Sequence, residues 1–263
     1  MEALLIIVFA VLGLVIGSFL NVCIDRLPAG RSLVSPPSFC DACQQRLSAR
    51  DLIPVFSYLW LRGRCRYCEA HIPQRILWVE VGTALLLAFL YWYYGLTPQF
   101  AITAFYCCIF IIIMAIDIEH QLILNKVVYP SVGIALVLSI FFPESAGISL
   151  PWPAAVNGII AGAMGFVLLL IPALVFRGGM GFGDVKMAAL IGLVTGFPGV
   201  FVALFVGIVL GGLVAIFLLL TRMKQRKDPI PFGPFLALAT MATLLYGGQL
   251  LDHYLSLLRY PIP

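Results

Sequence analysis

The chain consists mostly of long apolar runs separated by short polar segments. Runs of roughly 17 to 25 residues have the length that a helix needs to cross a bilayer. Glycine and proline residues, which mark helix ends, stand between the runs. The pattern predicts an all-α polytopic membrane protein with about eight transmembrane helices, two of them short, near residues 4–22, 76–95, 98–116, 127–142, 155–176, 186–198, 200–221 and 231–250.

The composition supports a membrane protein. Of 263 residues, 62% are hydrophobic and 11% are charged, and the mean hydropathy is +1.06. A single soluble core could not bury so much apolar surface. The first apolar run lacks the basic start and the small-residue cleavage motif of a secretory signal, so we expect a retained helix. The net charge of +4 does not indicate a nucleic-acid partner, because basic loops commonly set the orientation of membrane proteins.

The distribution of basic residues predicts the orientation. In the eight-helix arrangement, fifteen of the sixteen Lys and Arg residues fall on one side of the membrane, and Arg259 falls on the other. Under the positive-inside rule the basic side is cytoplasmic, which places both termini outside the cytoplasm. Six spanning helices with two re-entrant segments would give the same distribution.

One polar stretch, about residues 23–75, is long enough to fold by itself, and it contains two C-x-x-C pairs. Cys40 and Cys43 form the first pair, and Cys65 and Cys68 form the second, at a spacing just beyond the usual range of four-cysteine zinc sites. Each pair can present two thiolates, and four thiolates complete a structural Zn²⁺ site that would stabilise so small a domain. Two disulfides or redox pairs are the alternatives, which a reducing cytoplasm disfavours.

These features suggest three domains. We expect a first transmembrane helix at residues 1–22, a cytoplasmic four-cysteine zinc domain at 23–75 and a larger transmembrane domain at 76–263. No internal repeat is evident along the chain. The remaining cysteines, Cys23, Cys107 and Cys108, lie in or beside apolar runs and are interpreted as inert.

Acidic residues in or beside apolar runs are candidates for chemistry, because charge is costly at membrane depth. Asp117, Asp184 and Glu80 meet this description. Each alone could be a helix cap or an interface carboxylate paired with arginine. Asp117 and Asp184 are favoured as a pair because they come from different loops on the same expected membrane face. One carboxylate of such a pair can act as a general base on water while its protonated partner polarises a carbonyl group.

Glycines at positions 178, 179, 181 and 183 precede Asp184 and would let an extended peptide approach closely. The alternative is a flexible loop before a helix, with Asp184 as the N-cap residue. Motifs of competing chemistry are absent from the sequence: there is no H-E-x-x-H, no G-x-S-x-G and no dinucleotide-binding fingerprint.

Taken in order, several motifs resemble those of the bifunctional type IV prepilin peptidases, aspartic proteases of the Gly-x-Gly-Asp class. The resemblance runs nearly from end to end. Its blocks are Gly17–Pro28, the two C-x-x-C pairs with Asp51–Leu59 and Arg62-Gly-Arg64 between them, Ile116-Asp117, Gly181-Phe-Gly-Asp-Val-Lys186 and Pro231–Phe235.

The resemblance implies that Asp117 and Asp184 are catalytic, with Gly181, Gly183, Lys186 and Glu80 in supporting roles. It implies a multi-pass protein of the bacterial inner membrane whose partners are the bilayer and its substrates, prepilins and pseudopilins. A short basic leader would be removed at the cytoplasmic face, usually between Gly and Phe. A second implied activity is N-methylation of the new terminus by S-adenosylmethionine, associated with the cysteine-bearing loop.

One departure from the family concerns the turn after Asp117. The family commonly has Leu-Pro-Asp before the next helix, whereas this chain has Leu122-Ile-Leu-Asn125-Lys126. Two other functional classes stay open. In a transporter or channel, the acids would bind a cation or relay protons, although both are expected at one face rather than at the midplane. In a zinc-bearing scaffold for pilus assembly, the acids would have no role.

Overall fold

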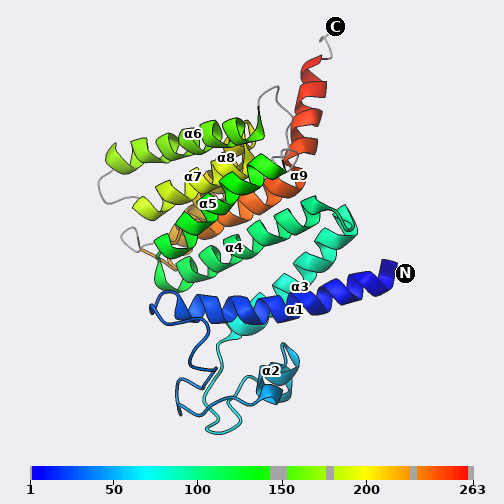
Figure 1. Cartoon of the computed structure of the whole chain (residues 1–263). Helices are drawn as coiled ribbons and strands as arrows, with labels where there is room; N and C mark the ends of the chain where they lie inside the picture. Colours follow the sequence, from blue (N-terminus) through cyan, green and yellow to red (C-terminus); the bar gives the residue numbers. More distant parts are fainter. Residues whose placement is uncertain (1, 143–152, 176–180, 226–229, 260–263) are drawn as a thin grey trace. The chain divides into compact units, whose positions relative to one another are not determined.

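The computed structural model describes residues 2–142, 153–175, 181–225 and 230–259 (Figure 1). Within these ranges the chain is helical and contains no strand, which confirms the predicted fold class. The elements are α1 (Glu2–Arg26), the 3₁₀ helix η1 (Ala49–Leu52), α2 (Phe56–Trp60), α3 (Gln74–Tyr94), α4 (Pro98–His120), α5 (Asn125–Phe141), α6 (Ala154–Val175), α7 (Phe182–Thr195), α8 (Gly199–Leu220) and α9 (Gly233–Arg259).

Each of the eight predicted apolar segments overlaps one helix. Among the described residues, five helices are long and apolar enough to cross a membrane: α1, α3, α4, α6 and α8. Helix α5 is shorter, at 17 residues, and α7 has 14. Several helices extend past the apolar windows, because backbone hydrogen bonding continues into polar residues that hydropathy assigns to loops. Asp117 lies in such an extension, near the end of α4.

The chain divides into two compact units, residues 1–104 and 105–263. In the first unit α1 packs along α3, and two glycines of α1 lie against the α3 backbone. A Cβ atom at Gly13 would be 2.6 Å from Cα of Ala84, and one at Gly17 would be 2.7 Å from Cα of Glu80. Residues four apart share one helix face, so Gly13 and Gly17 form a small-residue strip that permits this close approach. The division into three domains expected from the sequence, at residues 1–22, 23–75 and 76–263, stays a prediction.

The second unit uses the same kind of contact between its helices. Helices α6 and α7 approach so closely that a Cβ atom at Gly192 would lie 2.2 Å from the carbonyl oxygen of Ala161. Helix α8 meets α9 at Gly207, where a Cβ atom would lie 2.9 Å from the Leu236 side chain. Lipid gives apolar helices little reason to associate, so packing between small residues is a main source of helix affinity in a membrane.

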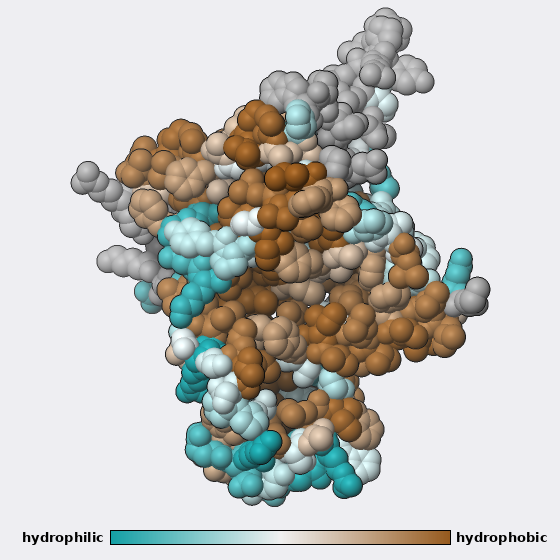
Figure 2. Space-filling model, in the orientation of Figure 1, coloured by the Kyte–Doolittle hydropathy of each residue, from teal (hydrophilic) through white to brown (hydrophobic). Residues whose placement is uncertain are grey.

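Large apolar side chains cover much of the outside of the helices, as the brown surface in Figure 2 shows. A soluble monomer rarely exposes apolar surface on this scale, whereas a lipid-facing surface requires it. Trp78 and Trp92, each 67% exposed, lie near the two ends of α3. Tryptophan is enriched at both membrane interfaces, and these two residues have the positions expected of interfacial side chains.

The close approach of α1 to α3 generates a prediction. Replacing Gly13 by leucine should separate the two helices and destabilise the folded protein by roughly 1 to 3 kcal/mol, as overpacking does. The measurement is the thermal unfolding midpoint in detergent micelles. Gly82→Leu is the matched control, because a Cβ atom at Gly82 of α3 meets nothing within 4 Å. Equal midpoints for the two variants would contradict the close approach at Gly13.

Candidate functional site

Asp117 and Asp184 lie together in the second unit. Asp117 is near the end of α4 and is 5% exposed, and Asp184 is in the first turn of α7 and is 9% exposed. The Asp117 carboxylate is near enough to act electrostatically on Asp184. The fold therefore brings two acids from separate helices into one buried site.

The Asp117 carboxylate is held by the start of α9. The backbone N–H of Gly233 donates a hydrogen bond to Asp117 Oδ2 at 2.9 Å. The first N–H groups of a helix lack partners within it, so they are available to bind a carboxylate. A Cβ atom at position 233 would lie 2.7 Å from the same oxygen, and only glycine leaves the carboxylate undisturbed there. The apolar pattern did not reveal this role, although Pro234 directly after the glycine is a signal of a helix start.

Asp184 organises the start of α7. Its backbone N–H donates to the Gly181 carbonyl at 3.1 Å, and its carboxylate accepts a hydrogen bond from the Gly181 N–H. Gly181 is the N-cap residue of the helix. The alternative that made Asp184 the N-cap is therefore wrong, because the helix begins earlier than the apolar run and includes Asp184. Gly178 and Gly179 lie outside the described residues.

Gly183 and Lys186 connect α7 to α5 and to the segment before it. A Cβ atom at Gly183 would lie 2.8 Å from Cβ of Ile123, so this glycine allows close packing. Lys186 Nζ donates to Asn125 Oδ1 at 3.0 Å and lies 5.5 Å from the centre of the Tyr129 ring. Asn125 belongs to the segment that departs from the family pattern, and no motif had assigned it or Tyr129 a role. These contacts fix the orientation of the turn that carries Asp184.

In the first unit, the two C-x-x-C pairs adopt the same knuckle. In each, the N–H of the first cysteine donates to the carbonyl five residues later, and its carbonyl accepts from the N–H four residues later. The residue after the second cysteine, Gln44 or Glu69, has a positive φ of 58° or 59°. Cys40-Asp-Ala-Cys-Gln-Gln-Arg-Leu47 and Cys65-Arg-Tyr-Cys-Glu-Ala-His-Ile72 therefore form two turns with the same backbone pattern.

The four sulfur atoms of the knuckles converge. All four Sγ atoms lie within 4.8 Å of one another, and Cys40 Sγ is 3.8 Å from Cys68 Sγ. Thiolates bound tetrahedrally to zinc at about 2.3 Å are themselves separated by about 3.8 Å. All four cysteines are free, so the structure contains no disulfide within this group. The group could hold a metal ion.

The thiols respond differently to this environment. The backbone N–H groups of Tyr67 and Cys68 stabilise the Cys65 thiolate and lower its pKa to about 7. The Ala70 N–H favours the Cys68 thiolate, but desolvation and the neighbouring thiols outweigh it and raise the pKa of Cys68 to about 12. Four thiolates so close together require a cation among them, which is the condition that a bound metal ion satisfies.

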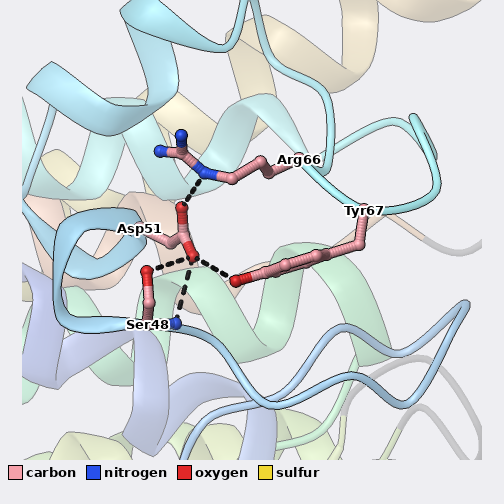
Figure 3. A network of polar contacts seen from close by, with 4 residues as sticks. All are labelled: Ser48, Asp51, Arg66 and Tyr67. Carbon is pink, nitrogen blue, oxygen red and sulfur yellow. Dashed lines mark hydrogen bonds and ion pairs between the residues drawn. The ribbon is translucent and has the colours of Figure 1, made fainter.

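A carboxylate braces the second knuckle from inside the module (Figure 3). Asp51 Oδ1 accepts from Arg66 Nε at 2.6 Å, while Oδ2 accepts from the N–H and hydroxyl of Ser48 at 3.0 and 2.7 Å and from the Tyr67 hydroxyl at 3.3 Å. Burial of Asp51, whose side chain is 3% exposed, opposes its charge, but the bonds from Ser48 and Arg66 outweigh this and lower its pKa to about 2. Arg66 and Tyr67 are the two residues between Cys65 and Cys68. Asp51 therefore fixes the turn that presents these thiols.

Glu80 holds the module against the helices of the first unit. Its buried side chain accepts a hydrogen bond from the Val55 N–H at 2.7 Å and another from the Ser18 hydroxyl. Ser18 lies in α1, Glu80 in α3 and Val55 directly before α2. A carboxylate buried at membrane depth is thus used to join three segments, while its supporting role in catalysis stays a prediction.

Helices with a lipid-facing surface, a buried pair of carboxylates and a four-cysteine module define a polytopic membrane protein with a candidate acid–base site. Residues 11–94 match the model of the Bacterial Peptidase A24 N-terminal domain, and residues 104–216 match that of the Type IV leader peptidase family. The chain belongs to the type IV leader peptidase family, as the resemblance predicted.

Curated relatives share nearly the whole chain. A "Prepilin leader peptidase/N-methyltransferase" from Pseudomonas putida is 33% identical over 274 residues, which cover 95% of this chain and 93% of the relative. A protein of the same name from Bacillus subtilis (strain 168) is 29% identical over 247 residues, covering 94% of this chain and 96% of the relative. No solved structure matches the chain.

The sulfur geometry predicts that the purified protein carries one metal ion per chain. Cys40→Ser or Cys65→Ser should abolish binding, because three thiolates and a hydroxyl hold a soft metal far more weakly than four thiolates. The measurement is elemental analysis of the detergent-solubilised protein. Cys108→Ser, which changes a cysteine of α4, is the control and should retain the metal. Metal-free protein with four reduced thiols in the module would contradict the metal site.

Proposed function

We propose that this chain is a membrane aspartic endopeptidase that removes the short basic leader of prepilins and pseudopilins, typically between Gly and Phe. We further propose that it methylates the new amino terminus with S-adenosylmethionine. The observation that carries the peptidase proposal is the meeting of Asp117 and Asp184 in one buried site. The names of the relatives, which combine leader peptidase and N-methyltransferase, support both activities.

The chemistry follows from placing two like charges together. Two neighbouring carboxylates do not both ionise readily, so one keeps a proton while the other is charged. The charged member takes a proton from a water molecule, which attacks the carbonyl carbon of the scissile bond. The protonated member donates a hydrogen bond to the carbonyl oxygen and stabilises the negative charge that develops on it. Collapse of the tetrahedral intermediate transfers a proton to the leaving nitrogen.

The surrounding residues position this pair. Gly233 holds Asp117 and Gly181 holds Asp184, in each case through a backbone N–H at the start of a helix. Such donors are already oriented and cost little reorganisation during the reaction. Lys186 and Gly183 keep α7 packed against Asn125 and Ile123, which holds the start of the helix that carries Asp184.

The orientation belongs to the same proposal. Fifteen of sixteen basic residues fall on one side of the eight-helix arrangement, and that side is cytoplasmic under the positive-inside rule. Both termini would then lie outside the cytoplasm of a bacterial inner-membrane protein. The ends of α4 and α7 that carry the acids, and the four-cysteine module, would lie on the cytoplasmic side, where a basic leader remains.

The four-cysteine module would bind Zn²⁺. Four thiolates leave no open coordination position, so the ion would stabilise the fold rather than activate water. We associate the methyl transfer with this module, in agreement with the family resemblance. The amino nitrogen freed by cleavage would attack the methyl group of S-adenosylmethionine, breaking its S–C bond and releasing a proton and the neutral thioether.

The experiment that tests the function is incubation of the purified protein with a prepilin peptide and S-adenosylmethionine, followed by mass spectrometry. Loss of the leader and gain of one methyl group on the product are expected. Asp117→Asn or Asp184→Asn should each slow leader removal by roughly 10³-fold or more, since neither amide can replace the acid–base pair. Glu119→Gln, a change of an exposed acid in the same turn as Asp117, is the control and should cleave normally. Near wild-type cleavage by either asparagine variant would refute the carboxylate pair.

The contact between Asp117 and Gly233 makes a second prediction. Gly233→Ala should push the Asp117 carboxylate out of place and lower kcat for leader removal by roughly 10²-fold, the size of effect expected when a catalytic group is displaced by about 1 Å. The measurement is the rate of leader loss at saturating peptide. Gly212→Ala is the matched control, because a Cβ atom at Gly212 of α8 meets nothing within 4 Å. If both alanine variants cleave at the same rate, the hydrogen bond from Gly233 does not position Asp117.

A further inference from the structure

The four-cysteine module carries an exposed apolar surface centred on α2. Trp60 is 72% exposed and its ring stacks with that of Phe56 at 5.8 Å. We call this surface the α2 patch; its exposed residues are Leu52, Ile53, Phe56, Leu59 and Trp60. Figure 2 shows brown surface where Figure 1 draws α2, while much of the remaining module is teal or white. Five large apolar side chains on so small a domain need a covering environment.

The position of the α2 patch in depth is fixed by Glu80. This residue lies six positions after the start of α3, which corresponds to about 9 Å along the helix. Its carboxylate binds the N–H of Val55, the residue directly before α2. Trp78, an exposed aromatic of the kind enriched at membrane interfaces, is only two residues before Glu80. The beginning of α2 is therefore level with the first two turns of α3, rather than beyond the end of the helix.

The backbone conformation of Val55 shows that contacts hold the start of α2 in place. Val55 has a φ of 61°, a conformation that β-branched residues rarely adopt. Such a conformation persists only where surrounding contacts hold it. The hydrogen bond to Glu80, which Ser18 of α1 also supports, is such a contact. The module is thus tied to the membrane helices at the point where the α2 patch begins.

The charges beside the α2 patch favour its binding to an anionic surface. Arg50 precedes the patch, and Arg62 and Arg64 follow it directly; all three are exposed. Basic residues next to exposed tryptophan and phenylalanine are the pattern of a segment that lies in the headgroup layer of a membrane. The basic leader of a substrate is a less suitable occupant, because these arginines would repel it.

We propose that the α2 patch is a membrane-anchoring surface that inserts into the anionic headgroup layer of the leaflet from which α1 and α3 emerge. Trp60 and Phe56 supply the apolar insertion, and the flanking arginines bind lipid phosphate. The module would then lie on the bilayer at three points, the ends of α1 and α3 and the α2 patch. This proposal concerns the bilayer and is independent of the two proposed enzyme activities.

The test uses the tryptophan fluorescence of the full chain in vesicles. The chain has four tryptophans, at positions 60, 78, 92 and 152, and replacing all but Trp60 by phenylalanine leaves one probe. Vesicles contain phosphatidylethanolamine and phosphatidylglycerol with bromine near the headgroup end of the acyl chains. A protein with only Trp78 is the interfacial reference. Val34→Trp in the tryptophan-free background is the aqueous reference, because Val34 of the same module is 91% exposed.

Trp60 should behave like Trp78, with strong quenching by the brominated lipid and several-fold weaker quenching by aqueous acrylamide than at position 34. Replacing phosphatidylglycerol by phosphatidylcholine should increase the access of acrylamide to Trp60 and leave Trp78 unchanged. Quenching of Trp60 by acrylamide as strong as at position 34 would overturn the proposal. So would protection of Trp60 that requires added prepilin peptide, since the occupant would then be protein.

If the single-tryptophan chain does not fold, a difference measurement keeps the test decisive. The wild-type chain and Trp60→Phe are compared in the same brominated vesicles, and the difference in emission belongs to Trp60. A difference that brominated lipid removes supports insertion. A difference that survives brominated lipid but disappears with acrylamide contradicts it.

Discussion

The constraint on which the structure depends is the cost of placing a polar or charged group at membrane depth. Most buried polar side chains described in the helices have a hydrogen-bond partner within the protein. The Asn157 side chain, for example, accepts from the N–H of Phe197 at 3.0 Å, and Asn21 donates to the carbonyl of Ile76 at 3.0 Å. Asp117 and Asp184 satisfy the same demand with N–H groups at helix starts. Asp117 can be held in this environment because glycine at position 233 lets the backbone reach its carboxylate.

Close packing of helices is the second requirement, and small residues provide it. Glycines stand four residues apart at Gly13 and Gly17 in α1 and at Gly207 and Gly211 in α8, and each pair meets a neighbouring helix of its own unit. Backbones that approach to this degree leave little freedom for sliding or rotation. The helix ends are therefore fixed, and a carboxylate on one helix can be aligned with an N–H group on another. Packing at the helix middle and chemistry at the helix end are linked in this way.

The sequence predicts the helices well, because a bilayer imposes one length and one composition on every spanning segment. It also identifies Asp117, Asp184 and the four cysteines as candidates, since such residue types are conspicuous among apolar neighbours. It does not reveal Gly233 or Asn125 as partners, because those contacts depend on which segments pack side by side in the fold. Periodicity along one helix carries no information about that pairing. The matching backbone of the two cysteine turns is not evident from the sequence for a different reason, because most of their side chains differ.

Glu80 and the other two buried acids are held by different kinds of contact. Glu80 accepts hydrogen bonds from Val55 and Ser18, which belong to two separate segments of the chain. Asp117 and Asp184 each receive a backbone N–H at a helix start, and the charge of Asp117 acts on Asp184. Donated hydrogen bonds favour the charged form of a carboxylate, whereas burial and a nearby like charge favour the protonated form. A neighbouring acid, in addition to burial, therefore distinguishes the environment of Asp184 from that of Glu80.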